Sequence, residues 1–367
     1  MDNPASASAI SRNALVVLAV IASGATLYWL SGILTPLALA VFLAVMIDGF
    51  ARVLEHRLPG VSRRAALPLA VLLSLVIFGG SAFFLAENAA GFATEVMTYA
   101  PKLNALIGRA AGLVGVRTTV TLSTVIQQLD PTKYIGAVAK GLQNFTSTAG
   151  FVLVYAAFII ASRRTFERKM VALFRSREER QDAIAAFLRI RDGVEQYLWV
   201  QTITGGMIAV GSFIAMLAVG LNDAAFWAFL IFVISYIPVI GGFLGIVAPP
   251  LFALLQFDGL WQAIVLLLVL NGIGVVVGNF IYPRMQGRSL NMDPVVVLLA
   301  LAFWGAIWGL AGAFLSTPLT VMAMVILAQF EGTRWIAVLL SADGNPQQLR
   351  FARPDRPPDA GNGGAHE

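Results

Sequence analysis

The side chains that enzymes use most often for catalysis are scarce in this chain. It contains no cysteine and two histidines, His56 and His366. The lack of cysteine excludes disulfides, zinc-thiolate sites and thiol nucleophiles, and two isolated histidines leave no Ser-His dyad or HExxH zinc motif. Asp223, Asp258 and Asp293 fall at the ends of apolar segments, where they cannot form an intramembrane carboxylate pair. We therefore expect no catalytic residues, no metal and no cofactor, and we expect that the protein is not an enzyme.

One carboxylate, Asp48, lies within an apolar segment and has two interpretations. An ionisable residue in hydrocarbon is costly and is a functional candidate by default, which suggests ion coupling. Arg52 follows four residues later, however, on the same face of a helix, so the two side chains can also pair at the membrane interface. We favour the pairing and keep proton or sodium coupling through Asp48 as the alternative.

Neutral polar side chains are the chemistry that the apolar second half of the chain does offer. Thr202, Thr204, Ser212 and Thr320 belong to this set. The residues that we predict to bind a substrate are Gln201, Ser235, Asn271, Asn279, Ser316 and Thr317. Such groups suit a small, neutral, hydroxyl-rich solute better than an ion. For any single residue, hydrogen bonding between helices is the better explanation, and only the set as a whole favours transport.

Two apolar segments, residues 224–256 and 294–329, are too long for one ordinary span and contain helix breakers near their middles. The hinge and broken-helix residues that we predict are Pro238, Gly241, Gly242, Pro249, Gly309, Gly312 and Pro318. Proline and glycine interrupt helical hydrogen bonding, and at membrane depth the freed backbone groups must face protein or a water-filled cavity. We expect both segments to be re-entrant hairpins.

The elements that carry these residues must sit in lipid, because 58% of the 367 residues are hydrophobic and 12% are charged. An ordinary soluble domain is about 25% charged. About eight hydrophobic segments recur along the chain. The sequence thus predicts an all-α integral membrane protein with six spans plus two re-entrant hairpins. In this arrangement each hairpin follows a span, and the two units form an inverted repeat.

The basic residues, which outnumber the acidic ones by five, set the predicted orientation. No Lys or Arg occurs between Arg191 and Arg284, whereas the short links elsewhere are basic, and such links stay in the cytoplasm. Both termini are then cytoplasmic, and nucleic-acid binding is not needed to explain the charge. The predicted regions are 1–13, cytoplasmic; 14–86, spans one to three; 87–147, extracytoplasmic or interfacial helices; 148–162, span four; 163–194, a basic cytoplasmic helical region; 195–330, the transport core; and 331–367, a disordered cytoplasmic tail.

Several of these motifs, in this order, resemble the autoinducer-2 exporter (AI-2E) family, whose members are also described as PerM-type permeases. The residues that carry the resemblance are Ile237 to Gly242, Gly278 to Leu290 with Pro283 and Gly287, Asp293 and Pro294, and Gly309 to Leu319. The resemblance implies a bacterial inner-membrane transporter that exports a small furanosyl signalling molecule or another solute, and a homo-oligomer, most often a pentamer. Some relatives look like sodium or lithium/proton antiporters.

Two departures from the family pattern bear on the transported species. Val277 stands where many relatives carry Glu, and Asp293 stands where His often precedes Pro294. The missing Glu argues against cation antiport. We predict an exporter of a small polar organic solute, such as an autoinducer-2-like molecule of quorum sensing, that works by alternating access. The partners are then the solute, membrane lipids and further copies of the chain. The alternatives are a sodium (lithium)/proton antiporter and a non-transporting membrane scaffold.

Overall fold

The structure is a computed structural model that describes residues 18, 21–57, 63–99, 101–102, 105, 148–162, 165, 169, 176–286 and 291–344. The predictions for residues 1–13 and for Gly287 lie outside the described residues, as do most of those for 106–147, 163–175 and the tail after residue 344. Within the described ranges the elements are helices, and a single antiparallel bridge joins Met292 to Ser341. The all-helical prediction is therefore confirmed for this part of the chain.

The helices follow the apolar segments of the sequence. Their bounds are α2 Ser31–Arg57, α3 Arg63–Thr98, an unlabelled helix Thr148–Ser162, α7 Arg177–Val219, α8 Ala224–Ser235, α9 Ile240–Gln256, α10 Trp261–Val276, the π-helix η1 Val277–Ile281, α11 Tyr282–Gln286, α12 Pro294–Leu327 and α13 Arg334–Leu340. In the described part, four stretches are long and apolar enough to cross a membrane: Ser31–His56, Ala183–Val219, Trp261–Gln286 and Pro294–Leu327. The number of spans and the borders of the predicted regions stay predictions.

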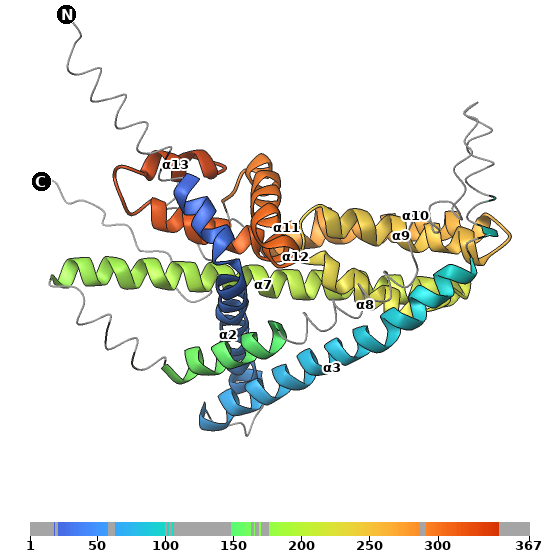
Figure 1. Ribbon diagram of the computed structural model, residues 1–367, viewed down its shortest axis with the longest axis horizontal. Coiled ribbons are helices and arrows are strands. Elements are labelled where there is room, and N and C mark those ends of the chain that lie inside the picture. The colour runs from blue at the N-terminus through green and yellow to red at the C-terminus, as the bar shows by residue number, and fades with distance from the viewer. Residues whose placement is uncertain are drawn as a thin grey trace, which may run out of the picture.

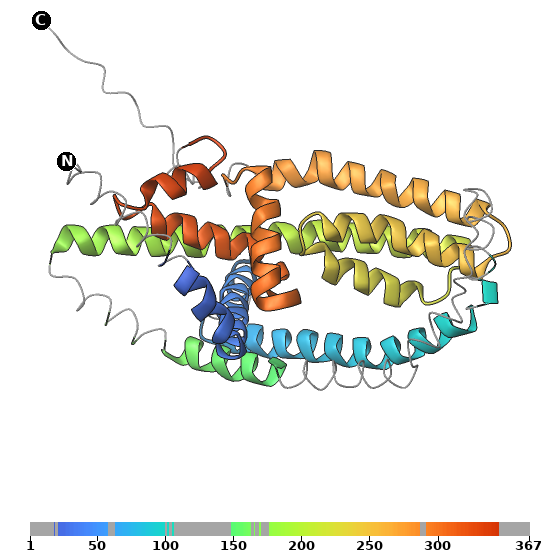
Figure 2. The same ribbon diagram turned by 45° about the horizontal axis from the view of Figure 1, so that its top comes forward.

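The 43-residue helix α7 runs through the length of the molecule (Figure 1). It continues without a break from the basic stretch into the apolar one, because no Pro occurs between Arg177 and Val219. One half packs on α8, α9 and α10 in a core that includes Met216, Trp227 and Leu266. The other half packs on α2 and α12, where α2 lies across α7 rather than alongside it (Figure 2).

Helices α8 and α9 form a hairpin. The Gln256 side chain at the end of α9 accepts a hydrogen bond from Asn222 N at 2.8 Å and donates one to Gly220 O at 2.9 Å, so both ends of the hairpin lie together. The chain reverses between Tyr236 and Val239, within the predicted break. Val239 has a φ of 64° there. Gly241 follows because a Cβ at that position would overlap the Ile234 carbonyl oxygen.

Helix α12 also folds back on itself. Gly309, with φ 60° and ψ −138°, interrupts it, and Trp304 Nε1 donates a hydrogen bond of 3.0 Å to Thr320 Oγ1 across the break. These two residues would lie about 24 Å apart in a straight helix. Met292, just before α12, packs against Met324 near its end. Both long segments are therefore hairpins in the structure, whereas their re-entry into a membrane stays a prediction.

Helix α3 and the residues after it reach the open end of the α8–α9 hairpin, opposite its turn. Glu95 Oε1 accepts a hydrogen bond of 2.8 Å from Asn222 Nδ2. Lys102 Nζ donates to Asp258 Oδ1 at 2.8 Å and to Phe257 O at 2.7 Å. The region predicted to lie outside the membrane thus begins with two contacts to this hairpin, one to the loop before α8 and one to the loop after α9. We call this pair of contacts the clasp.

Candidate functional site

A cavity of about 300 Å³ lies between α7 and the two hairpins. Its walls come from α7, α8, α9, α10, η1, α11 and both halves of α12. Its lining includes Tyr197, Gln201, Thr204, Gly205, Ile208, Ser212, Ser235, Pro238, Gly241, Gly242, Gly274, Val277, Gly278, Tyr282, Val297 and Thr317. The described part of the chain thus has an internal space at the place where its two broken helices meet.

The cavity is long and narrow because it follows one face of α7. Tyr197, Gln201, Ile208 and Ser212 recur there at helical spacing. The first and last of them are 15 positions apart, a rise of about 22 Å. A space of this length and about 300 Å³ has the form of a passage rather than a compact pocket.

The lining is mostly apolar and contains polar residues but no charged one. The polar residues of the lining are Tyr197, Gln201, Thr204, Ser212, Ser235, Tyr282 and Thr317. None of the lining residues is Asp, Glu, Lys, Arg or His. An ion would enter this space without a counter-charge, which is costly away from water, whereas a neutral solute with hydroxyl groups can be hydrogen-bonded by this set.

Two hydroxyl groups in the lining are deeply buried. Ser212 is 1% exposed, and its Oγ has no hydrogen-bond partner among the described residues. Thr317 is 2% exposed and faces the phenol of Tyr197. A buried polar group without a partner costs about 1–3 kcal/mol. Ser212 therefore has hydrogen-bonding capacity that a solute or a water in the cavity can satisfy.

Polar side chains of α7 hold the tip of the α8–α9 hairpin. Gln201 Nε2 donates a hydrogen bond to Ser235 O, and the Tyr197 hydroxyl donates one to Tyr236 O at 3.4 Å. Thr202 Oγ1 and the Tyr236 hydroxyl lie 2.6 Å apart. The carbonyls at the end of α8 have lost their helical partners, so these contacts satisfy groups that the break exposes.

The tips of the two hairpins meet next to the cavity. The ring of Tyr236 stacks on that of Phe314 with centroids 4.9 Å apart, and Tyr236 shares a core with Leu315 and Leu319 of α12. Gly205 of α7 allows the close approach, because a Cβ there would overlap the Ser235 hydroxyl. A movement of either tip would therefore change the shape of the cavity.

The π-helix η1 forms part of the opposite wall. Val277, Gly278 and Tyr282 line the cavity at this point, and single π-turns inside α-helices are frequent at functional sites. Val277, where the resemblance to the family implies a Glu in other members, is an apolar side chain that is 4% exposed. This wall therefore has no carboxylate to bind or exchange a cation.

The structure brings some of the predicted site residues to the cavity and places others elsewhere. Gln201, Ser235, Thr317, Pro238, Gly241 and Gly242 line it. Asn271 and Asn279 are exposed and are not part of the lining. Ser316 is buried, and its Oγ donates to Ala313 O of its own helix at 2.8 Å. Pro249 lies buried inside α9, whereas Gly309, Gly312 and Pro318 lie in the α12 hairpin.

The motif residues after α10 have local structural roles. Pro283 lies in α11. Asp293 caps α12, with Oδ1 accepting a hydrogen bond of 2.7 Å from Val295 N, and Pro294 stands at the first helical position. This is the usual chemistry of a helix start. It explains Asp293 without a role in transport.

Sequence reasoning missed two tyrosines of the lining, Tyr197 and Tyr282. A signal for Tyr197 was present, because it precedes Gln201 by four residues and extends the same polar face of α7. Tyr282 carries no such signal. Its position depends on the π-turn of η1, which shifts the helical register and is not visible in the sequence.

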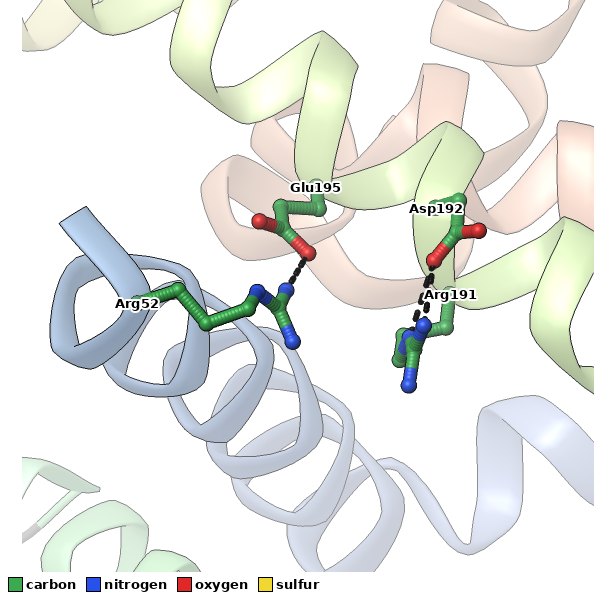
Figure 3. Close-up of polar contacts among 4 residues, drawn as sticks. All are labelled: Arg52, Arg191, Asp192 and Glu195. Carbon is green, nitrogen blue, oxygen red and sulfur yellow. Dashed lines mark hydrogen bonds and ion pairs between the residues drawn. The ribbon is translucent and has the colours of Figure 1, made fainter. Parts of the chain in front are cut away.

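Asp48 and Arg52 lie apart from the cavity. Arg52 forms an ion pair with Glu195 of α7, as Figure 3 shows, and Arg191 pairs with Asp192 at 2.7 Å one turn before it. A Cβ at Gly49 would lie 2.8 Å from Glu195 Oε1, so glycine permits this contact between α2 and α7. Sequence reasoning missed Glu195. Asp48 is half-buried and is not part of the lining.

Two carboxyl groups lie next to each other at the open end of the α8–α9 hairpin, that of Asp223 just before α8 and that of Glu95 in α3. A hydrogen bond with Glu95, together with burial and repulsion between the two groups, raises the pKa of Asp223 to about 6. The hydrogen bonds from Asp223 and Asn222 lower the pKa of Glu95. Lys102 likewise lowers the pKa of Asp258. Among the described residues, no group of three or more His, Cys, Asp or Glu side chains could hold a metal ion.

Apolar helices, two hairpins and a cavity between them that carries polar but no charged side chains together indicate a multi-pass α-helical membrane protein of the transporter class. Residues 15–332 match the family described as AI-2E family transporter, and the chain belongs to that family. This confirms the resemblance seen in the motifs.

Relatives agree with this assignment. The AI-2 transport protein TqsA of Escherichia coli K12 is 28% identical over 84% of this chain and 89% of its own length. A Haemophilus influenzae protein, provisionally named as a transport protein, is 29% identical over 90% of this chain and 96% of its own length. The E. coli permease PerM, also provisionally named, is 25% identical over 86% and 92% of the two chains.

Proposed function

We propose that this protein moves a small, uncharged, polar solute across the bacterial inner membrane through the cavity between α7 and the two hairpins. The observation that carries the proposal is the lining, which contains seven polar residues and no charged one. Transporters with inverted repeats commonly bind their substrate where broken helices meet. Autoinducer-2 is the first solute to test, because one relative is named an AI-2 transport protein, and a role in quorum sensing would follow from its export.

The mechanism that fits the geometry is alternating access by movement of the hairpin tips. Gln201 and Tyr197 hold the tip of α8 from one side, and Phe314 packs against it from the other. When the tip leaves these partners, the cavity opens on one side. Gly241 and Gly309 provide the backbone freedom for this movement.

Cation antiport finds no support in the cavity. Val277 provides no carboxylate, and Asp48 lies elsewhere, beside an arginine that already pairs with Glu195. Export as the direction of transport, cytoplasmic termini and a pentameric assembly are proposals that rest on the charge pattern and on the family.

The test is flux in proteoliposomes with a plugged cavity. Gly242 lines the cavity, and a Cβ added there would meet no atom within 4 Å, so Gly242→Leu fills the passage without a backbone clash. Gly272→Leu is the matched control, because Gly272 is equally open but lies outside the lining.

We expect Gly242→Leu to lower autoinducer-2 flux at least about ten-fold, which corresponds to about 1.4 kcal/mol, and Gly272→Leu to retain it. Equal flux in the two folded variants would contradict the proposed path. No flux of autoinducer-2 or neutral polyols in the unmodified protein would favour the non-transporting scaffold instead.

A further inference from the structure

The cavity along α7 opens at the turn of the α8–α9 hairpin. Val239 in this turn lines the cavity and is 61% exposed, and Gly242 and Gly278 also line it and are exposed. Tyr197 and Ser212 on α7 are in contrast buried. The opening therefore lies between the start of α9 and η1, on the side of the cavity away from α7. We call Val239, Gly242 and Gly278 the mouth of the cavity.

A pair of glycines keeps the mouth open. Helices α9 and α10 are joined by the short link 257–260 and lie side by side in opposite directions (Figure 2). They come close together where a Cβ on Gly274 would lie 3.1 Å from Ile246 Cδ1. Gly242 and Gly278 are each four residues from this contact, toward the hairpin turn, so they lie on the two sides of the same seam. A Cβ on either glycine would meet no atom within 4 Å, so a gap remains between them.

The surface around the mouth is apolar. Phe243, Val276 and Phe280 are 63%, 52% and 56% exposed. No charged residue occurs in the stretches of sequence that surround the mouth, 237–244 and 275–282. Large exposed apolar patches mark contact with a membrane or a protein rather than with water. The surroundings of the mouth therefore suit hydrocarbon.

The lengths of the two hairpin helices set the depth of the mouth. Helix α8 has 12 residues and α9 has 17, so they are about 18 and 26 Å long. Both are shorter than a hydrocarbon core of about 30 Å. The links at their other ends carry Asn222, Asp223 and Asp258, polar residues that belong at the membrane surface. A re-entrant hairpin that starts from this surface therefore ends, with the mouth at its turn, inside the hydrocarbon.

The inside of the cavity offers the hydrogen bonds that hydrocarbon lacks. Ser212 is 1% exposed, and its Oγ has no partner among the described residues. An uncharged polar group that enters can bond to this hydroxyl, whereas a charged group would find no counter-charge in the lining. The cavity thus combines polar groups inside with an opening to acyl chains. It is complementary to a molecule that has an uncharged polar head and an apolar tail.

We propose that the cavity binds uncharged amphiphiles that enter sideways from the membrane, with the polar head group at the buried hydroxyls and the apolar tail at Phe243 and Phe280. The inference rests on the proposed function for the binding site and on the re-entrant hairpin for its depth. It adds a class of ligand that a path open only to water would not select. A monoacylglycerol has this chemistry, because its head group carries hydroxyl groups and no charge.

Photolabelling of the full-length protein in proteoliposomes tests this site independently of flux. The probe is a monoacylglycerol with a diazirine at the end of its acyl chain, and the comparison is lysophosphatidylglycerol with the same chain. We expect the monoacylglycerol to label residues 239–244 and 275–282 at least about ten-fold more strongly, because the lining has no counter-charge for a phosphate group. Excess unlabelled monoacylglycerol should suppress this labelling, whereas general contact with lipid does not saturate.

Gly278→Leu narrows the mouth and should abolish the labelling that competes. Gly272→Leu is the matched control on α10 and should retain it, because Gly272 is equally open but lies outside the lining. The proposal is overturned if both probes label equally, or if the two folded variants label equally. Competed labelling in a protein that moves no solute would contradict transport but support the amphiphile site, and full autoinducer-2 flux without competed labelling would do the reverse.

A cysteine at Val239 tests the surroundings of the mouth without filling it. The chain has no other cysteine, so Val239→Cys reports alone. We expect a lipid-soluble maleimide to label it, and a charged, impermeant reagent to leave it unlabelled from both sides of the membrane. Reaction with the charged reagent would show that the mouth faces water, and a disulfide between two copies would show that a neighbouring chain covers it. Either result overturns the proposal.

Discussion

Ser212 shows at the level of one residue how the cavity can favour a solute over the empty state. Its hydroxyl is buried at the wall of the cavity and has no partner among the described residues. An unpaired buried hydroxyl opposes folding, and a solute that bonds to it recovers the loss. The same atom can therefore be unfavourable for stability and favourable for binding.

Ser212→Ala should separate these two effects. The variant removes the unpaired hydroxyl, so we expect thermal stability to be unchanged or higher. Solute binding should weaken about five- to ten-fold, which corresponds to a lost hydrogen bond of about 1 kcal/mol. Thermal unfolding measures the stability, and the concentration dependence of flux measures the solute binding. Weaker stability together with unchanged flux would assign Ser212 to packing alone.

The Asp223–Glu95 pair predicts a pH dependence of the clasp between α3 and the α8–α9 hairpin. The pKa of Asp223 is raised to about 6, so its stabilising contribution is present below its ordinary pKa of 3.8 and is lost as the pH rises through about 6. The pKa of Glu95 is lowered, so its contribution is present above its ordinary value of 4.5 and is lost as the pH falls. The two contributions together are therefore largest near the ordinary values of 3.8 and 4.5, and the clasp weakens as the pH rises from there through about 6.

Hydrogen exchange of residues 220–224 measures this clasp. Exchange, corrected for its intrinsic pH dependence, should be faster at pH 7.5 than at pH 5.5, and Asp223→Asn should remove the difference because the amide does not ionise. The Lys102–Asp258 pair stays charged over this range, since Lys102 lowers the pKa of Asp258. A pH difference that persists in Asp223→Asn would assign it to another group.

At the scale of elements, the positions of the breaks in the long helices were predictable from the sequence. The residues that pair between distant helices were not. Pro238 cannot continue an ordinary helix, and Gly241 and Gly309 weaken one, so the positions of the breaks are local information. The partner of Arg52 is Glu195, 143 residues away, whereas an i,i+4 pattern points to Asp48. Contacts between distant helices decide such pairs.

Asn271 and Asn279 illustrate the same limit. Eight residues apart, they would lie on similar faces of one regular helix. The structure inserts the π-turn Val277–Ile281 at this point, which changes the register, and packing directs Val277 and Gly278 to the cavity instead. The sequence likewise did not predict that α7 is one continuous helix, because its basic half and its apolar half differ in composition.

Gln201→Leu tests the role of the contacts that hold the hairpin tip. The Ser235 carbonyl would lose its partner, at a cost of about 1–3 kcal/mol if it stays buried. We expect hydrogen exchange of residues 235–240 to accelerate at least about five-fold. Gln329→Leu is the control, because the Gln329 amide donates only to Val325 O of its own helix. Equal exchange of the tip in both variants would show that Gln201 does not hold it.

At the scale of the whole molecule, the hairpins decide the topology. The chain has no cysteine, so single cysteines can be labelled without background. If both long segments are re-entrant, Asp258→Cys should react with an impermeant thiol reagent from outside, and Arg284→Cys and Gly332→Cys from the cytoplasmic side. All three residues are exposed. Labelling of Arg284→Cys only from outside would contradict the hairpin topology and the inverted repeat.

The passage along α7 is the central claim, and protection of a cysteine within it is the most direct measurement. Gly242→Cys places a thiol in the cavity, and Gly272→Cys places one outside it. We predict that saturating autoinducer-2 slows the reaction of Gly242→Cys with a small thiol reagent at least about five-fold, as expected for an occupied site, and leaves Gly272→Cys unchanged. If the transported solute protects neither position, or both equally, the solute does not pass through this cavity.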